Sequence, residues 1–225
     1  KKNKNTAFEQ NGGDLRIDPK NCNILINDYT KPSSNKRFYS LNICTGEVLV
    51  MPSSHGKGGG KGTRQNSKGK ARHFSDKPGT NMSPTGFLII GQEYRGKDPW
   101  KPGIKLHGLQ KAEKGGDEKS RHEGNRNTYG RGVVLHKSKS FKGDYCKGTI
   151  SSSKEPRPML NGKECGRTHG CLGVPSTSWD YVYKNLKGKE EKNGLVSGPL
   201  LYTFGPKQAN KPMDYCGGNN LWKKN

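Results

Sequence analysis

The sequence is poor in apolar residues and in acidic residues, and it contains no long apolar run. Only 28% of its 225 residues are hydrophobic, so the folded core must be small relative to the loops. No run approaches the roughly 18 apolar residues that cross a bilayer, and we expect no transmembrane helix. The first residues, KKNKNTAFEQNGG, lack the apolar centre of a secretion signal, so we expect any such signal to be missing already.

The shortage of acidic residues leaves a large positive charge. Lysine and arginine number 41 against 19 acidic residues, which gives a formal net charge of +22. Such a field favours polyanionic partners, namely nucleic acid, phospholipid headgroups or acidic cell-wall polymer, without choosing among them. Aromatic residues are not interleaved with the basic ones, as single-stranded nucleic acid would require, so nucleic acid is not the expected partner.

Metal and phosphate motifs are also lacking. The six cysteines form no C-x-x-C pair, and the histidines form no H-x-H or H-x-x-x-H pair, so we expect no metal site. The glycine-rich stretch 56–63 is not a phosphate-binding loop, because Gly62 follows Lys61 where serine or threonine belongs. The sequence therefore predicts neither a metal nor an organic cofactor.

Cysteines without metal spacing favour disulfides and an oxidising compartment. If Cys171 must stay a free thiol, five others remain, so at most two disulfides form and one more thiol stays free. We favour Cys146–Cys165, because both cysteines lie in one loop.

Short apolar clusters enriched in β-branched and aromatic residues predict strands. They span residues 23–28, 37–43, 47–51, 86–94, 105–109, 132–136 and 200–204. The 86–94 segment is almost continuously apolar and is therefore expected at the centre of a sheet. Residues 44–46, Cys-Thr-Gly, predict a tight hairpin turn. The basic, glycine-rich stretch 55–74 is expected to bury nothing and to form a loop.

One amphipathic helix is predicted near the C-terminal end. Trp179, Val182, Tyr183 and Leu186 recur at helical spacing. Ser178 or Ser176 is expected to cap its start, and Gly188 to end it. Seven strands and one helix predict a mainly β domain of the α+β class, with long basic loops.

The stretch GRTHGCLGV, residues 166–174, sets Cys171 in a glycine-flanked turn. A nucleophilic cysteine needs a lowered pKa, a nearby base and N–H groups aimed at a developing oxyanion. Gly170 allows a sharp turn in which its N–H and that of Cys171 converge. The neighbouring basic residues and the helix that follows both favour a thiolate. A half-disulfide or an inert buried thiol remains the alternative.

His136 ends the apolar segment GVVLH, where a base can meet solvent and substrate. A histidine at the end of a strand is usually an ordinary surface residue. Here, however, the loop that follows it returns to Thr168-His169-Gly170-Cys171.

The pair VVLH and GRTHGC resembles the histidine and [S/T]-H-G-C signature of YkuD-type L,D-transpeptidases, which act on peptidoglycan. The similarity extends over roughly residues 37–205. It includes FYSLNICTGEVLVMPSSHGKG, FSDKPGTNMSPTGFLIIGQEYRGK, IKLHGLQ and the closing LLYTFG. The resemblance implies a mixed β-sheet sandwich with one main helix after the catalytic cysteine.

The resemblance also implies roles for individual residues. Cys171 becomes the nucleophile, His136 its general base and Gly170 part of the oxyanion site. Substrate binding is assigned to Arg167, Thr168, His169, His107 and Tyr94. The chain departs from the family pattern after the cysteine, where Leu172 is followed by Gly173 instead of asparagine or arginine. The loop between His136 and Thr168 is also longer than usual.

From this resemblance we predict a catalytic domain at residues 37–205, an N-terminal extension at 1–36 and a C-terminal extension at 206–225. The expected protein is an exported monomer of the periplasm or cell wall that acts on anionic peptidoglycan stem peptides by cysteine acyl transfer. Two alternatives stay open. One is a carboxypeptidase or endopeptidase that only hydrolyses, and the other is a non-enzymatic basic protein that binds wall material or nucleic acid.

Overall fold

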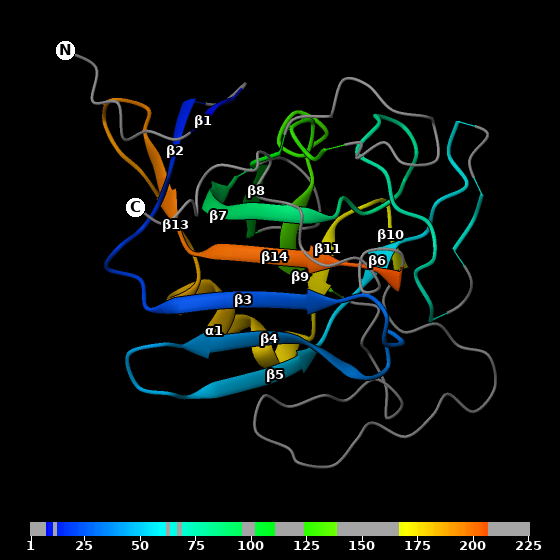
Figure 1. Cartoon of the computed structure of the whole chain (residues 1–225), viewed down its shortest axis with the longest axis horizontal. Coiled ribbons are helices and arrows are strands. Elements are labelled where there is room, and N and C mark those ends of the chain that lie inside the picture. Colours follow the sequence, from blue (N-terminus) through cyan, green and yellow to red (C-terminus); the bar gives the residue numbers. More distant parts are fainter. Residues whose placement is uncertain are drawn as a thin grey trace, which may run out of the picture.

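A computed structural model describes residues 8–10, 13–61, 64–66, 69–95, 102–110, 124–138 and 167–206. Its elements follow one another along the chain as a series of strands interrupted by one helix (Figure 1). They are β1 (Phe8–Gln10), β2 (Gly13–Ile17), β3 (Asn23–Asp28), β4 (Lys36–Asn42), β5 (Val48–Pro52), β6 (His55–Gly56), β7 (Gly86–Tyr94), β8 (Gly103–Gly108), β9 (Val134–Lys137), β10 (Arg167–Thr168), β11 (Leu172–Val174), α1 (Ser176–Asn185), β12 (Lys189–Glu190), β13 (Val196–Gly198) and β14 (Leu200–Phe204).

An eight-stranded mixed sheet forms the body of the molecule, in the order β11-β9-β8-β7-β14-β3-β4-β5. Its β11–β9 and β14–β3 pairs are parallel and its other pairs are antiparallel. Each of the seven predicted strands is confirmed, and β7 lies at the centre of the sheet as predicted. The observed architecture is the expected mainly β sandwich with one helix after Cys171.

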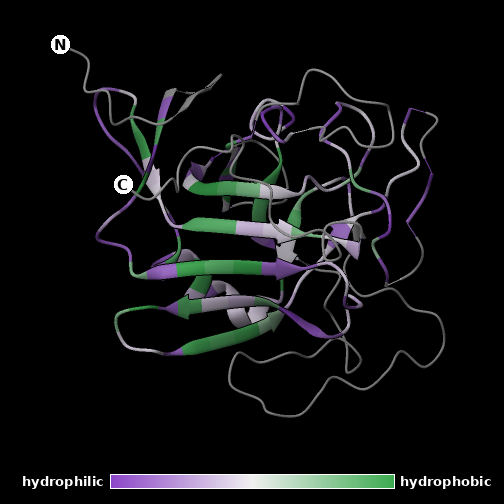
Figure 2. Cartoon of the chain, in the orientation of Figure 1, coloured by the Kyte–Doolittle hydropathy of each residue, from purple (hydrophilic) through white to green (hydrophobic). Residues whose placement is uncertain are grey.

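The main core lies on one face of this sheet. In β7, Leu88 and Ile90 point into it, while the alternating neighbour Ile89 points to a smaller cluster on the other face. Helix α1 covers the main face with Trp179 and Val182. Burial of each aliphatic side chain contributes roughly 1.5–3 kcal/mol, which is why a chain with so few apolar residues gathers them on the strands. Figure 2 shows this segregation, with apolar strands and polar connections.

The helix is confirmed, but its predicted caps are wrong. Pro175 is the N-cap, Ser176 is already helical, and no side chain caps the first turn. Proline fixes its own φ, here −57°, but its ring has no acceptor for the N–H groups of the first turn. At the other end the helix stops at Asn185 with Leu186 as the C-cap, before Gly188.

A second, four-stranded sheet in the order β1-β2-β13-β12 was not predicted. Leu15 of β2 and Val196 of β13 pack with Ile89 to form the smaller apolar cluster. These strands are only two to five residues long, so their alternation is too brief to recognise in the sequence. The segment assigned to an N-terminal extension supplies β2 to this sheet and β3 to the large one.

The glycine-rich stretch 55–74 is mostly irregular, but the prediction that it buries nothing is wrong. His55, Asn66 and Ala71 are all buried. The Asn66 side-chain amide donates to the carbonyls of Gly56 and His73 at 2.8 and 3.0 Å, and its oxygen accepts main-chain N–H groups of residues 72 and 73. A polar loop can therefore be buried because one asparagine satisfies four main-chain groups.

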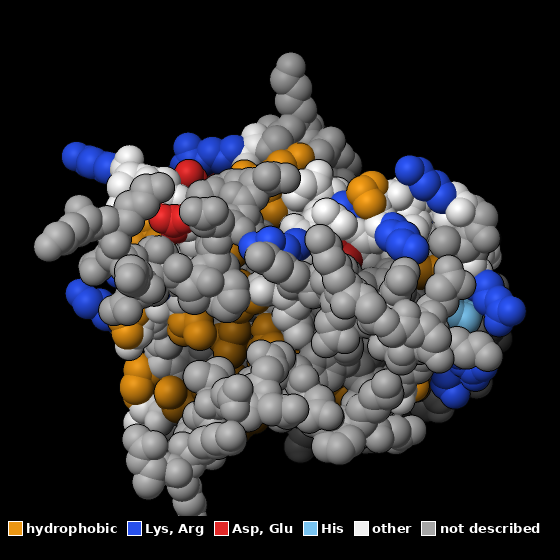
Figure 3. Space-filling view, turned by 45° about the horizontal axis from the view of Figure 1, so that its top comes forward, with side chains coloured by type: hydrophobic (Ala, Val, Ile, Leu, Met, Phe, Trp, Pro, Cys, Tyr) orange, Lys and Arg blue, Asp and Glu red, His pale blue; other side chains and the backbone are white. Residues whose placement is uncertain are grey.

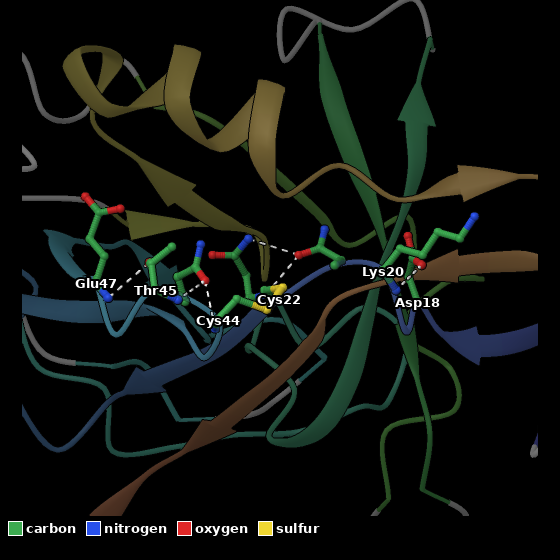
Figure 4. Close-up of a disulfide and its surroundings, with 9 residues drawn as sticks. Asp18, Lys20, Cys22, Cys44, Thr45 and Glu47 are labelled. Carbon is green, nitrogen blue, oxygen red and sulfur yellow. Dashed lines mark hydrogen bonds between the residues drawn. A yellow bond between two sulfur atoms is a disulfide. The ribbon is translucent and has the colours of Figure 1, made fainter.

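A disulfide joins Cys22, just before β3, to Cys44 in the β4–β5 turn (Figure 4). The turn itself is confirmed, with Gly46 at a φ of 76° and its N–H bonded to the Asn42 carbonyl at 2.8 Å. Cys171 is the one free cysteine among the residues that the structure describes. The favoured pair, Cys146–Cys165, lies outside those residues.

Lysine and arginine side chains appear at several separate places on the face shown in Figure 3, and acidic side chains at few. A cluster of exposed apolar side chains is also visible there. No helix in the described part of the chain is long and apolar enough to cross a membrane.

Candidate active site

The turn that carries Cys171 depends on glycine at position 170. Gly170 has a φ of 121°, and a Cβ there would lie 2.9 Å from the Met82 carbonyl oxygen. Thr168 ties the turn together, because its hydroxyl donates to the Cys171 carbonyl at 2.7 Å and accepts the Gly170 N–H at 3.2 Å. The Gly170 N–H, expected to converge with that of Cys171 on an oxyanion, is therefore engaged within the turn.

The parallel pairing of β9 and β11 sets His136 and Cys171 on one face of the sheet. Leu172 is opposite Leu135, and both side chains enter the main core. Because side chains alternate, His136 and Cys171 occupy the opposite face, two residues apart in register on neighbouring strands. Standard strand spacings place their Cα atoms about 8 Å apart, which a histidine ring and a cysteine side chain can span.

His136 is held as a neutral base. Its Nδ1 lies 2.8 Å from the Lys137 carbonyl oxygen. A carbonyl only accepts, so Nδ1 carries the proton and Nε2 is the basic nitrogen. Burial lowers the pKa of the ring, although the bond to Lys137 acts in the opposite direction. The ring is almost fully buried, contrary to the expectation of a residue that meets solvent.

Cys171 is held as a thiol, although its basic neighbours favour a thiolate. Burial raises its pKa above the ordinary value of a cysteine. The main-chain N–H of Val134 and the positive charges of Arg131 and Lys105 lower the pKa, but burial outweighs them. The resting pair is therefore an uncharged thiol and an uncharged imidazole, so a proton transfer must precede attack.

Lys105 is a cation on the same face as Cys171. Its neighbours Ile104 and Leu106 enter the main core, so Lys105 points to the other side. Its ammonium lies between the rings of Tyr94 and Tyr129, at 4.6 and 4.9 Å from their centroids. Burial lowers the pKa of Lys105, and the electrostatic interaction with Cys171 opposes that shift. The residue thus supplies positive charge to the nucleophile.

His107 lies deeper than predicted. Its side chain is fully buried and stacks on Tyr129 with ring centroids 4.6 Å apart, and its Nε2 lies 2.9 Å from the Gln92 side-chain oxygen. Burial lowers the pKa of His107 to about 4, and the charge of Lys105 adds to the shift. The His107 ring therefore supports Tyr129 and does not face a substrate. Tyr129 in turn contacts Lys105.

Arg131 brings a second cation close to the turn. Its guanidinium pairs with Asp76 at 3.1 Å and donates to the Met82 carbonyl at 2.7 Å, the carbonyl that also excludes a side chain at Gly170. Both partners of this pair are buried. Because Arg131 is held by Asp76 and also donates to the Met82 carbonyl, it fixes residue 82 against the cysteine turn.

The remaining predicted residues lie beside the turn. Arg167 and Thr168 form β10, which pairs with His55 and Gly56 of β6. His169 is exposed, and nothing is described of the Arg167 side chain. The long basic loop between His136 and Thr168 lies almost wholly outside the described residues. Those residues contain no group of three or more His, Cys, Asp or Glu side chains able to hold a metal ion.

Several residues at the site were not identified from the sequence. Ser54 forms hydrogen bonds with the edge of β11 that does not face β9. Its N–H donates to the Gly173 carbonyl at 2.8 Å, and its Oγ accepts the Gly173 N–H at 2.6 Å. Ser83 donates to the Gly170 carbonyl at 3.1 Å. Lys105 and Arg131 were likewise missed. The one signal in the sequence is that Ser54, Ser83 and Lys105 lie in segments that resemble the family.

The sequence model of the L,D-transpeptidase catalytic domain matches residues 16–191, which is most of the chain. The chain belongs to the L,D-transpeptidase catalytic domain family. Members of this family are cysteine-dependent enzymes that act on the cell wall. The comparisons with curated proteins and with solved structures found no match. The matched range of this L,D-transpeptidase domain begins within β2 and so includes β3, upstream of the predicted start at residue 37.

Proposed function

We propose that the protein is a peptidoglycan L,D-transpeptidase in which Cys171 is the nucleophile and His136 its general base. The observation that carries the proposal is the parallel pairing of β9 with β11, which sets the two residues on one face of the sheet. The substrate class is the stem peptide of peptidoglycan, which carries free carboxylates that suit the positive charge of this chain.

In the first half-reaction the Nε2 atom of His136 accepts the thiol proton, and the sulfur attacks the carbonyl of the L,D peptide bond after diaminopimelate. The resulting oxyanion is stabilised by the main-chain N–H of Cys171. When the C–N bond breaks, His136 returns the proton to the nitrogen of the leaving D-alanine, and a thioester on Cys171 remains.

In the second half-reaction an amine attacks the thioester. A diaminopimelate side-chain amine of a second stem peptide gives a cross-link, and a free D-amino acid gives exchange. His136 accepts a proton from the incoming amine and passes it to the departing sulfur, which restores the thiol. Water in place of the amine gives carboxypeptidase activity by the same steps.

Substrate binding is proposed for the residues beside the nucleophile. Thr168 and His169 border the turn and Arg167 precedes it, while Tyr94 lies against the ammonium of Lys105. A guanidinium or ammonium in this position would bind a carboxylate of the stem peptide.

We further propose that the protein acts outside the cytoplasm, in the periplasm or cell wall. The Cys22–Cys44 disulfide supports this, because such bonds persist in oxidising compartments.

Incubation with a purified stem tetrapeptide tests the function. Mass spectrometry should detect free D-alanine together with a cross-linked dimer, and Cys171→Ser should abolish both. Release of D-alanine with tripeptide alone would identify a hydrolase. Absence of any Cys171-dependent product would refute the proposal.

A further inference from the structure

Ser83 connects the glycine-rich stretch to the nucleophile turn. It is buried, and its Oγ accepts the Gly56 N–H at 2.8 Å. The same atom lies 3.1 Å from the Gly170 carbonyl oxygen. Ser83 also lowers the pKa of the nearby Tyr29 phenol. Two main-chain groups that are far apart in the sequence therefore meet at one hydroxyl.

The chemistry of these groups fixes the direction of each bond. A serine hydroxyl donates one hydrogen and accepts two. The Gly56 N–H can only donate, and the Gly170 carbonyl can only accept, so the hydrogen of Ser83 goes to Gly170. Burial raises the pKa of Tyr29, so its phenol stays protonated.

The bond to the Gly170 carbonyl orients the next N–H. In a trans peptide unit the carbonyl of Gly170 and the N–H of Cys171 point in opposite directions. A carbonyl held toward Ser83 thus directs the Cys171 N–H away from Ser83. That N–H faces the sulfur of its own residue and lowers the thiol pKa. Since the Gly170 N–H bonds to Thr168, the Cys171 N–H is the donor of this turn that faces the reacting atom.

We infer that Ser83 is a positioning residue that aims the Cys171 N–H at the oxyanion formed during acyl transfer. The inference rests on the proposed function, since it needs Cys171 as the nucleophile. Ser83 does not touch the substrate. It holds one peptide plane and polarises it, because donation to the carbonyl increases the partial positive charge on the N–H.

The surroundings hold Ser83 in place. A Cβ at Gly56 would lie 2.5 Å from the Asn81 carbonyl oxygen and 2.6 Å from the Ser83 nitrogen, so the backbone at Gly56 is in direct contact with this segment. Behind Tyr29, the guanidinium of Arg37 lies 5.1 Å from the ring centroid and is itself fully buried. The contact gives a physical reason for glycine in the His55-Gly56 motif. The N–H of Gly56 reaches Ser83, and there is no room for a side chain at that position.

Two probes of Cys171 separate orientation of the N–H from general reactivity. Acylation by a carbapenem passes through an oxyanion, whereas alkylation by iodoacetamide displaces iodide and forms none. In Ser83→Ala the acylation rate should fall about tenfold or more while the alkylation rate stays near that of the wild type. Ser83→Thr, which keeps the hydroxyl, should restore acylation.

Ser40→Ala is the matched control. It removes another buried hydroxyl, one that donates to Asn23 within the large sheet and not to the nucleophile turn, so the ratio of acylation to alkylation should be unchanged. Equal losses of both rates in Ser83→Ala, or no loss of acylation, would overturn the inference. If Ser83→Ala does not fold, Ser83→Cys keeps the size with a weaker donor, and peptide mapping then reads Cys171 alone.

His136→Ala distinguishes failure of this inference from failure of the proposed function. It should slow both reactions, because both need the thiol proton removed. If His136→Ala slows neither reaction, the proposed function fails whatever Ser83 does. If it slows both and Ser83→Ala changes neither, only the inference about Ser83 fails.

Discussion

Gly173 of β11 lies directly opposite His136 of β9, and Gly103 of β8 lies opposite His136 on its other side. The imidazole therefore has no side chain beside it on either neighbouring strand. The next position on the same face is Cys171, just before β11. The leucine-glycine pair after the cysteine departs from the family pattern, and glycine fits at 173 because Ser54 and Ser138 occupy the space that a side chain would need.

A side chain at position 173 should disturb the site. In Gly173→Ala the new Cβ would meet the Ser54 Oγ at 2.7 Å and the Ser138 Cβ at 2.8 Å, so β11 must shift away from its neighbours. A displacement of about 1 Å between nucleophile and base can lower a rate by about 100-fold. We expect carbapenem acylation to fall by that order, measured by intact mass. An acylation rate equal to that of the wild type would contradict the view that the distance between Cys171 and His136 depends on glycine at position 173.

The reactivity of Cys171 should depend on pH as that of a thiol, not as that of an ion pair. Burial raises the pKa of the thiol and lowers that of His136, so both groups are neutral near pH 7. The thiolate fraction then increases as pH rises toward the raised pKa. Alkylation by iodoacetamide should accelerate continuously between roughly pH 7 and pH 9. A rate that is already constant below pH 7 would indicate a preformed thiolate-imidazolium pair.

Lys105→Met should make Cys171 less acidic. The substitution keeps the length of the side chain and removes the positive charge that lowers the thiol pKa. We expect the midpoint of the alkylation profile to move to higher pH and the rate at neutral pH to fall. Lys189→Met in β12 is the control, since that exposed lysine belongs to the smaller sheet. Equal profiles for both variants would exclude an influence of Lys105 on the nucleophile.

Loss of the disulfide should affect stability more than reactivity. The bond closes a loop with a sequence separation of 22 residues, and its removal in Cys22→Ser/Cys44→Ser should lower the free energy of unfolding by about 3 kcal/mol. The disulfide lies beside the paired residues Asn23 and Asn42, at one end of β3 and β4. The chain leaves β5 toward the site at Pro52, at the other end of these strands. Urea unfolding measures the first effect and carbapenem acylation at low temperature the second. An unchanged unfolding midpoint would contradict this assignment.

The sequence predicted the long elements because apolar periodicity is a local signal. β3, β7 and β14 were predicted with the bounds they have in the structure. The strands of the second sheet, β1, β2, β12 and β13, were missed, because such short segments owe their conformation to their partner strands. The buried loop around Asn66 was misjudged for a related reason, since its burial depends on hydrogen bonds that join distant residues.

The candidate site was predictable only in part. Cys171 and His136 were identified from motifs, and their shared face is a consequence of register that no motif reports. Basic residues near Cys171 favour a thiolate, but burial outweighs them and raises the thiol pKa, an effect that a count of nearby charges omits. Ser83 could not be identified, because its role depends on a contact with Gly170, 87 positions away in the sequence.

The most direct measurement of the central claim is capture of the acyl-enzyme. The protein is mixed with a stem tetrapeptide and quenched in acid within the first turnovers, and the peptide that contains Cys171 is then analysed by mass spectrometry. We expect that peptide to carry the tetrapeptide minus D-alanine as a hydroxylamine-labile thioester, and His136→Ala to accumulate far less of it. D-alanine released while Cys171 stays unmodified, or an adduct on another residue, would contradict the account.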